Sequence, residues 1–293
     1  MGSEMIKDKL VVTPQRIHAL VKCVHVLGEV PRETLLDLLQ PNAITDNRET
    51  TILVYRYARR YDLVKENETT DRRVSLAIPA TVVTDYETFR QHMQQVLLGV
   101  TDEAQDNFLL SQFAAWYACQ DERVMGYSKA SFEAKFHEDL YPSSKQRVLA
   151  EQPGISAWRT WAEFLGWGWP LKFAQGEEAK IVPDATLRIR PLLLKLLPDL
   201  RIDVPLGAFV ARLGAICPEL DGGVLYARCW DASHGGEPRG NRVSLMVSTA
   251  LRVLNQQGAI ALIDRRDVAD NWTLFPAQSY INRVTHVQRK EVR

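Results

Sequence analysis

The stretch from Arg48 to Pro79 has two hydrophobic patterns in succession, which predict a helix followed by a β-hairpin. One face of the predicted helix is apolar and carries Val54, Tyr57, Ala58 and Tyr61. The opposite face is predicted to be exposed and carries Ile52, Tyr55, Arg56 and Arg59. The alternating run 74–78, which follows a polar tip, predicts the second strand of the hairpin.

The same order of elements is predicted near the middle of the chain, from Ala157 to Pro183. The apolar face of its helix is made of Trp158, Trp161, Ala162 and Leu165. Gly166 and Gly168 end this helix, and short apolar runs on either side of a polar tip predict the strands. The clustered tryptophans, which also include Trp167 and Trp169, either stack on nucleic-acid bases or form core and domain interface. We prefer the core interpretation, because Trp158 and Trp161 lie on the inward face.

A third copy is predicted from Val243 to Pro276. Its helix ends at Gly258, and strands at 259–263 and 272–275 are predicted to pair across a charged tip. Residue identity between the copies is low, so the repeat is one of structure. A helix followed directly by a hairpin is the arrangement of the recognition helix and wing in winged-helix domains.

The remaining patterns complete three predicted domains. Thr13 followed by Pro14 predicts the start of a helix that ends at Gly28, and a second helix is predicted at 31–39. Further helices without a hairpin are predicted between 85 and 149. We therefore predict a mainly α protein with small β-hairpin wings, an α+β fold of tandem winged-helix domains. The predicted domains are an N-terminal winged helix at 1–84, a helical region with a middle winged-helix-like domain at 85–200, and a C-terminal winged helix at 201–293.

The composition is that of an ordinary folded protein. The chain has 293 residues, of which 46% are hydrophobic and 25% are charged. No apolar run approaches the roughly 18 residues that cross a membrane, so we expect no membrane segment and a cytoplasmic location. The four cysteines form no CxxC pair, and the segment with Cys217, Cys229 and His234 matches no standard zinc site. We expect no metal and no cofactor.

The formal net charge is zero, so any contact with nucleic acid must depend on local positive charge. The candidate DNA-binding residues fall into two groups. The first group, on the Arg48 helix and its wing, is Arg48, Arg56, Arg59, Arg72 and Arg73. The second group, in the third copy, is Arg239, Arg242, Ser244, Ser248, Arg252, Arg265 and Arg266.

The second group is predicted to supply sequence specificity. Ser244, Ser248 and Arg252 are expected on the outer face of their helix, where small hydroxyls and an arginine suit a major groove. The segment 235–242 leads into the N-terminus of that helix, where free amides favour an anion. This segment either contacts a DNA phosphate or is a flexible surface loop. It lacks the Lys-Ser/Thr ending of a phosphate-binding P-loop, so nucleotide hydrolysis is not expected.

Catalytic motifs are not found. The chain has no GxSxG and no HExxH, and no acidic pair stands beside a histidine in a recognisable arrangement. Asp264 and Asp267 flank arginines at a predicted wing tip, where solvated ion pairs are the ordinary outcome. We expect no enzyme and no catalytic residues.

The length and the repeated helix and hairpin pattern resemble the DpdG-type accessory proteins of bacterial 7-deazaguanine DNA-modification islands. The resemblance covers most of the chain and rests on architecture, with no diagnostic motif. It implies a non-catalytic component that works beside helicase and nuclease partners in modifying or restricting foreign DNA. It supplies no site residues.

Two functional hypotheses follow. The first is a protein that binds double-stranded DNA, either a transcriptional regulator or the DNA-recognising subunit of an antiviral defence or modification complex. The second is a winged-helix scaffold that joins protein partners in such a complex without touching DNA, which zero net charge and the tryptophan-rich middle copy would suit. Protein partners are expected in both cases, and the sequence also allows a homodimer.

Overall fold

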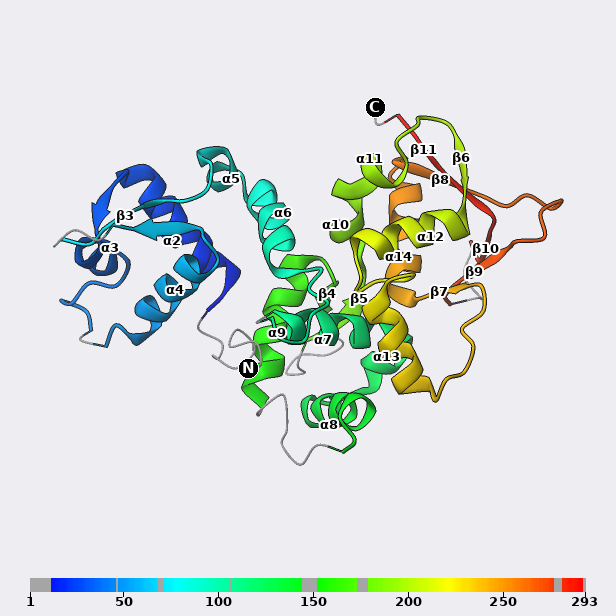
Figure 1. Cartoon of the computed structure of the whole chain (residues 1–293), viewed down its shortest axis with the longest axis horizontal. Helices are drawn as coiled ribbons and strands as arrows, with labels where there is room; N and C mark the ends of the chain where they lie inside the picture. The colour runs from blue at the N-terminus through cyan, green and yellow to red at the C-terminus, as the bar shows by residue number, and fades with distance from the viewer. Residues whose placement is uncertain are drawn as a thin grey trace.

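The computed structural model describes residues 12–45, 47–67, 71–105, 107–143, 152–172, 179–276 and 281–291. In the described part, helices dominate and the β-sheets are small, so the predicted mainly α, α+β class is confirmed. The N-terminal helices and their sheet lie at one end of the molecule, and the C-terminal elements lie at the other (Figure 1). Helices from the middle of the chain connect the two ends.

The N-terminal unit packs three helices against one sheet. Its elements are α2 (Pro14–Leu27), β1 (Val30–Pro31), α3 (Arg32–Leu39), α4 (Glu49–Arg60), β2 (Val64–Glu66) and β3 (Arg73–Leu76). The predicted cap is confirmed, because the Thr13 side chain accepts a 3.3 Å hydrogen bond from the Arg16 amide. The predicted hairpin is also present, and β3 lies between β2 and the short strand β1, with Val30 opposite Val74.

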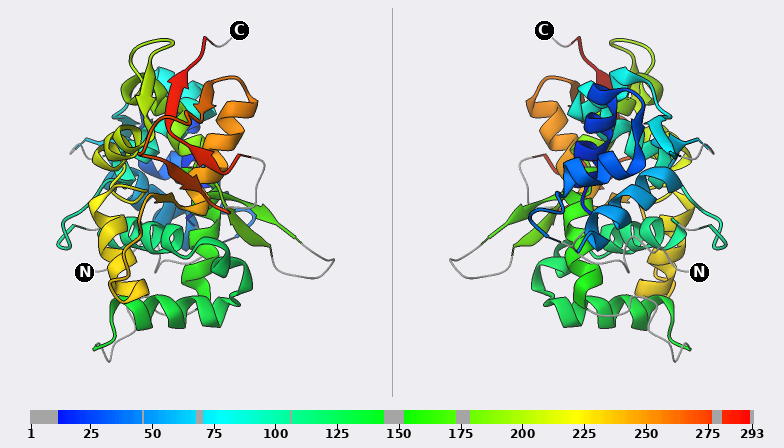
Figure 2. Two further views of the ribbon diagram at one scale, coloured as in Figure 1. Left: turned by 90° about the vertical axis from the view of Figure 1, so that its right-hand side faces the viewer. Right: turned by 90° about the vertical axis from the view of Figure 1, so that its left-hand side faces the viewer.

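The middle of the chain is helical and ends in a second hairpin. Its elements are α5 (Ala80–Thr84), α6 (Tyr86–Leu97), α7 (Phe108–Cys119), η2 (Asp121–Gly126), α8 (Lys129–Leu140), α9 (Gln152–Leu165), β4 (Gly168–Leu171) and β5 (Lys180–Pro183). Helix α7 is buried along almost its whole surface, as its composition predicts. Trp158, Trp161 and Trp167 are also buried, which confirms the core interpretation, whereas Trp169 is 43% exposed. Trp169 lies on the β4–β5 hairpin, which projects from the body of the protein (Figure 2).

The C-terminal part contains two small sheets. Its elements are α10 (Thr186–Ile189), η3 (Arg190–Leu192), α11 (Leu193–Leu196), β6 (Asp203–Pro205), α12 (Leu206–Ile216), α13 (Val224–His234), β7 (Arg242–Val243), α14 (Leu245–Gln256), β8 (Ile260–Ile263), β9 (Trp272–Leu274), β10 (Arg283–Val284) and β11 (His286–Arg289). The predicted pairing of β8 with β9 is wrong. Strand β8 pairs with β11, and β9 pairs with β10 and β7 in a separate sheet. Strand β11 lies between β6 and β8 with Val287 fully buried, so core packing favours that partner.

Helix α13 lies in a segment that contains several glycines. The glycines stand at its ends, where Gly223 precedes the first turn and Gly235 adopts φ 62° after the last. A left-handed residue at that position is a common way to end a helix, and glycine adopts it without steric cost. The glycine content of the segment therefore marks helix ends.

One backbone pattern recurs after α4, α9 and α14. A residue beyond each helix donates to a carbonyl five positions earlier, in the pairs Leu63 to Ala58 (2.9 Å), Trp167 to Ala162 (2.9 Å) and Ala259 to Leu254 (3.0 Å). The preceding residue has positive φ in each case, at Asp62, Gly166 and Gly258. A residue near the end of the strand that pairs back then donates its amide to the carbonyl of that same residue beyond the helix. The pairs are Ala77 to Leu63, Asp184 to Trp167 and Lys290 to Ala259. The three helices therefore share one backbone pattern at their C-terminal ends, although the returning strand after α14 is β11 and not the predicted β9.

No helix in the described part of the chain combines the length and the apolar character that crossing a bilayer requires.

Candidate nucleic-acid interface

The outer face of α4 carries the largest group of solvent-exposed arginines among the sequence-predicted residues. Arg56 and Arg59 are exposed, as predicted, and Arg60 joins them on the same helix. Within the described residues, Arg56 has no hydrogen-bond or ion-pair partner. Its guanidinium is therefore available for an anion that comes from outside the chain.

Glu66 is the last residue of β2, before the turn of the hairpin, and organises the groups beside this face. Its carboxylate accepts a 2.6 Å hydrogen bond from the Tyr55 hydroxyl and a 2.8 Å bond from the Arg59 guanidinium. The Arg72 Nε lies 3.9 Å from the same carboxylate, while the Arg72 side chain is mostly exposed. The prediction that Tyr55 is exposed is wrong, because Tyr55 is only 2% exposed and turns its hydroxyl to Glu66. This burial raises the pKa of Tyr55, so the hydroxyl stays protonated and serves as a donor.

Arg48 and Arg73 mainly stabilise the N-terminal unit. Arg48 precedes α4 and pairs with Asp37, and it lies 3.6 Å from Glu33. Arg73 lies 3.2 Å from Asp71 and donates a 2.8 Å hydrogen bond to the backbone carbonyl of Glu29. Both guanidinium groups already have acceptors within the chain, so they contribute less free positive charge than Arg56.

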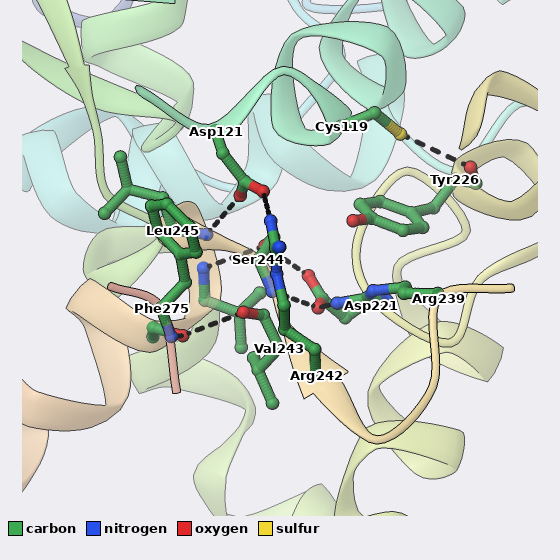
Figure 3. Close-up of polar contacts among 12 residues, drawn as sticks. Cys119, Asp121, Asp221, Tyr226, Arg239, Arg242, Val243, Ser244, Leu245 and Phe275 are labelled. Carbon is green, nitrogen blue, oxygen red and sulfur yellow. Dashed lines mark hydrogen bonds and ion pairs between the residues drawn. The ribbon is translucent and has the colours of Figure 1, made fainter. Parts of the chain in front are cut away.

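Arg239, Arg242 and Ser244 of the second predicted group belong to a buried polar cluster (Figure 3). Asp221 is fully buried and pairs with Arg239, and it also accepts hydrogen bonds from the amide (2.7 Å) and hydroxyl of Ser244. Asp121, which follows α7, pairs with Arg242 and accepts a 2.7 Å hydrogen bond from the Leu245 amide. Burial raises the pKa of Asp121, although these hydrogen bonds and the charge of Arg242 oppose the shift.

The cluster occupies the N-terminus of α14 with the chain's own carboxylates. Ser244 caps the helix, and its hydroxyl accepts a 3.3 Å hydrogen bond from Val247. Asp121 and Asp221 supply the negative charge that this helix end favours. An external phosphate would have to displace them, so the structure corrects the expectation of a free anion site after segment 235–242.

The expected outer face of α14 is likewise not exposed. Ser244 and Ser248 are buried, and among the residues of α14 only Gln256 is exposed, while Leu245, Thr249, Arg252, Val253 and Asn255 are half-buried. The Ser248 hydroxyl donates to the Val243 carbonyl and accepts a 2.8 Å hydrogen bond from the Phe275 amide. The helical spacing was right, but the prediction of an exposed face was wrong. The described part of the segment that includes β9 and β10 contacts Ser248 and Arg252 through Phe275, Pro276 and Ile281.

Arg252 binds backbone carbonyls on that covering segment. It donates to Phe275 (2.6 Å), to Ile281 (2.8 and 3.0 Å) and to Pro276 (3.3 Å). Burial lowers the pKa of Arg252. The expected role of Arg252 in base recognition therefore has to compete with four hydrogen bonds that hold the segment to α14.

The two remaining arginines follow β8. Arg265 pairs with Asp203, the first residue of β6, whereas exposed Arg266 has no partner within the described residues. Cys217 and Cys229 are buried, and the His234 ring stacks on Trp230 at 3.8 Å. No group of three metal-ligating side chains occurs in the described part of the chain.

A family model of DpdG-like proteins matches residues 4–268, which is most of the chain. The chain belongs to the DpdG-like family. The predicted resemblance is thereby confirmed, and DpdG-like membership associates the chain with a multi-component DNA-modification system. No curated protein and no solved structure matches the chain.

Three acidic residues of this region were not singled out from the sequence. Glu66 pairs with Arg59, Asp121 pairs with Arg242, and Asp221 pairs with Arg239. The only signal was indirect, since zero net charge means that arginine-rich segments have acidic counterparts elsewhere in the chain.

Proposed function

We propose that this DpdG-like protein is a non-catalytic DNA-binding subunit of a bacterial DNA-modification or defence system. In this proposal it contacts duplex DNA through the first of its tandem winged-helix units. The element order of that unit, with three helices and a hairpin whose second strand pairs with β1, supports a winged helix. Helix α4 then has the place of the recognition helix and β2–β3 that of the wing.

The observation that carries the proposal is the exposed, unpartnered guanidinium of Arg56 on α4, with Arg59 and Arg60 beside it. Phosphate contacts of this kind release counterions and need no sequence information. Arg72, exposed at the hairpin, extends the basic face. We expect these residues to supply affinity for any duplex.

The C-terminal unit suits a different role. Arg239, Arg242, Arg252 and Arg265 are all bonded within the chain, and α14 is covered. These observations favour the second hypothesis, a winged-helix scaffold, for this part of the molecule. We therefore propose that the N-terminal unit binds DNA and the C-terminal unit docks protein partners.

Fluorescence anisotropy with a random 20-base-pair duplex tests the DNA contact. We expect Arg56→Ala to weaken binding and to reduce the slope of log K against log salt by about one unit. Arg228→Ala is the matched control, because Arg228 is exposed on α13, away from α4. No salt-dependent binding by the wild type, or equal losses in both variants, would remove DNA contact by α4 from the proposal.

A further inference from the structure

A groove lies where α10, η3 and α11 meet the end of β11. Figure 1 places α11 beside the C-terminal end of the chain. The groove has a volume of about 580 Å³ and an apolar floor of Pro191, Leu193, Leu194, Leu200 and Ala259. Leu194 is 66% exposed and Leu200 is 38% exposed. Exposed leucines that gather in a concave site mark a place where another apolar group can bind.

The rim of this groove is positively charged. Arg190 is bonded to the side-chain oxygen of Gln257, and Lys290 donates to that of Gln288 at 2.6 Å. Arg289 donates to the backbone carbonyls of Leu197 (2.7 Å) and Pro198 (2.5 Å). Within the described residues, these three cations pair with no carboxylate. Glu291, which also lines the groove, lies 3.2 Å from Arg201.

We propose that this groove binds an acidic segment of a partner protein that carries two or more apolar side chains. The leucine floor provides the apolar contact, and the rim cations provide charge complementarity to carboxylates. The groove fits DNA less well, because its centre is apolar and made largely of leucine side chains. This inference goes beyond the DNA contact of α4 and does not depend on it.

Selection from a random 16-residue peptide display library on the immobilised full chain tests the groove. We expect enriched peptides to be acidic and to carry spaced leucine, isoleucine or phenylalanine residues. Leu194→Asp should weaken their binding at least tenfold, because it places a carboxylate beside the apolar floor. Leu38→Asp is the matched control, since Leu38 is 55% exposed on α3, and it should leave binding unchanged.

A charge reversal separates the rim from the floor. Lys290→Glu should weaken the enriched acidic peptides and favour versions in which lysine replaces their acidic residues. Three outcomes overturn the proposal: no enrichment, enrichment of basic peptides by the wild type, or equal effects of Leu194→Asp and Leu38→Asp. A random 20-base-pair duplex is then added to the peptide complexes of the wild type and of Arg56→Ala. Equal displacement of the peptides from both would also overturn the proposal, because the groove would then be a nucleic-acid site.

Discussion

The Leu245 amide donates a 2.7 Å hydrogen bond to the Asp121 carboxylate, which lies 124 residues earlier in the chain. The bond joins the N-terminus of α14 to the end of α7. Together with the Asp221 interactions, it fills the helix end that the sequence suggested for a DNA phosphate. The main effect of this cluster should therefore be on the stability of the C-terminal unit.

Replacement of Asp221 tests that structural role. Asp221→Ala leaves Arg239 without its carboxylate and removes acceptors from Ser244, so we expect a loss of about 3 to 5 kcal/mol in the free energy of unfolding. Asp264→Ala is the control, because Asp264 is half exposed and its 3.1 Å pair with Arg283 lies at the surface. Its effect should stay below about 1 kcal/mol. Urea unfolding followed by tryptophan fluorescence measures both, and similar losses would contradict a special role for Asp221.

Arg252 should likewise act on stability and not on base recognition. Arg252→Ala removes four hydrogen bonds to the carbonyls of residues 275, 276 and 281, so we expect a loss of roughly 1 to 3 kcal/mol. Binding of random and preferred duplexes should change equally or not at all. Thermal unfolding together with anisotropy on both duplexes checks this, with Arg228→Ala as control. A selective loss on the preferred sequence would restore the role in base recognition.

Glu66 places a negative charge inside the proposed DNA-binding face. Glu66→Gln keeps an acceptor for Tyr55 but removes the charge beside Arg59 and Arg72. We expect tighter binding of random duplex, by a factor on the order of three at low salt. Asp267→Asn, an equivalent change after β8, should have no effect. Weaker binding of the duplex by Glu66→Gln would show that the main effect of Glu66 is to position Arg59 and Arg72, and that its repulsion of DNA phosphates is the smaller effect.

His18 is a source of pH dependence in the N-terminal unit. Its Nε2 lies 2.9 Å from the Val83 carbonyl, and its ring contacts Tyr86 and Phe89. Burial lowers the pKa of His18 below its ordinary value of 6.5, and nearby Lys22 adds to the shift, while the Val83 hydrogen bond and Asp85 oppose it.

The fold therefore favours neutral His18. Its stabilising contribution is complete above pH 6.5 and is lost as the pH falls from 6.5 through the lowered folded pKa, because the unfolded chain binds the proton more readily there. We expect His18→Gln to flatten the decline in unfolding free energy over that range by at most about 1.4 kcal/mol per pH unit. Urea unfolding between pH 7.5 and 5 measures this. An unchanged slope in His18→Gln would exclude His18 as the source of this pH dependence. His25→Gln is the control.

The sequence predicted local features better than distant pairings. Thr13, Gly166 and Gly258 mark helix ends through their own backbone preferences, and the structure confirms them. Asp62 adopts the same positive φ as those two glycines, so one helix end lacked the glycine signal. The burial of Trp158 and Trp161 also followed from helical periodicity.

The errors arose where partners are far apart in sequence. Strand β11 is short and its pairing with β8 depends on core packing of Val287, which a local pattern does not encode. Periodicity assigned Ser248 to an exposed face, because nothing near it in sequence indicated that Phe275 would cover it. Asp121 could not be linked to Arg242 without the fold, since 121 residues separate them.

Hydrogen exchange of the full chain with and without random duplex tests the central claim most directly. The proposal places DNA on α4 and on strands β2 and β3, so amides in 49–60, 64–66 and 73–76 should exchange more slowly when DNA is bound. Amides of α14, at 245–256, should be unaffected, because half of its residues are buried and Asp121, Asp221 and residues 275–276 already bind its N-terminus and its Ser248–Arg252 face. Protection that disappears in Arg56→Ala would support contact by this face. Protection centred on α14, or no protection at a duplex concentration that saturates anisotropy, would contradict it.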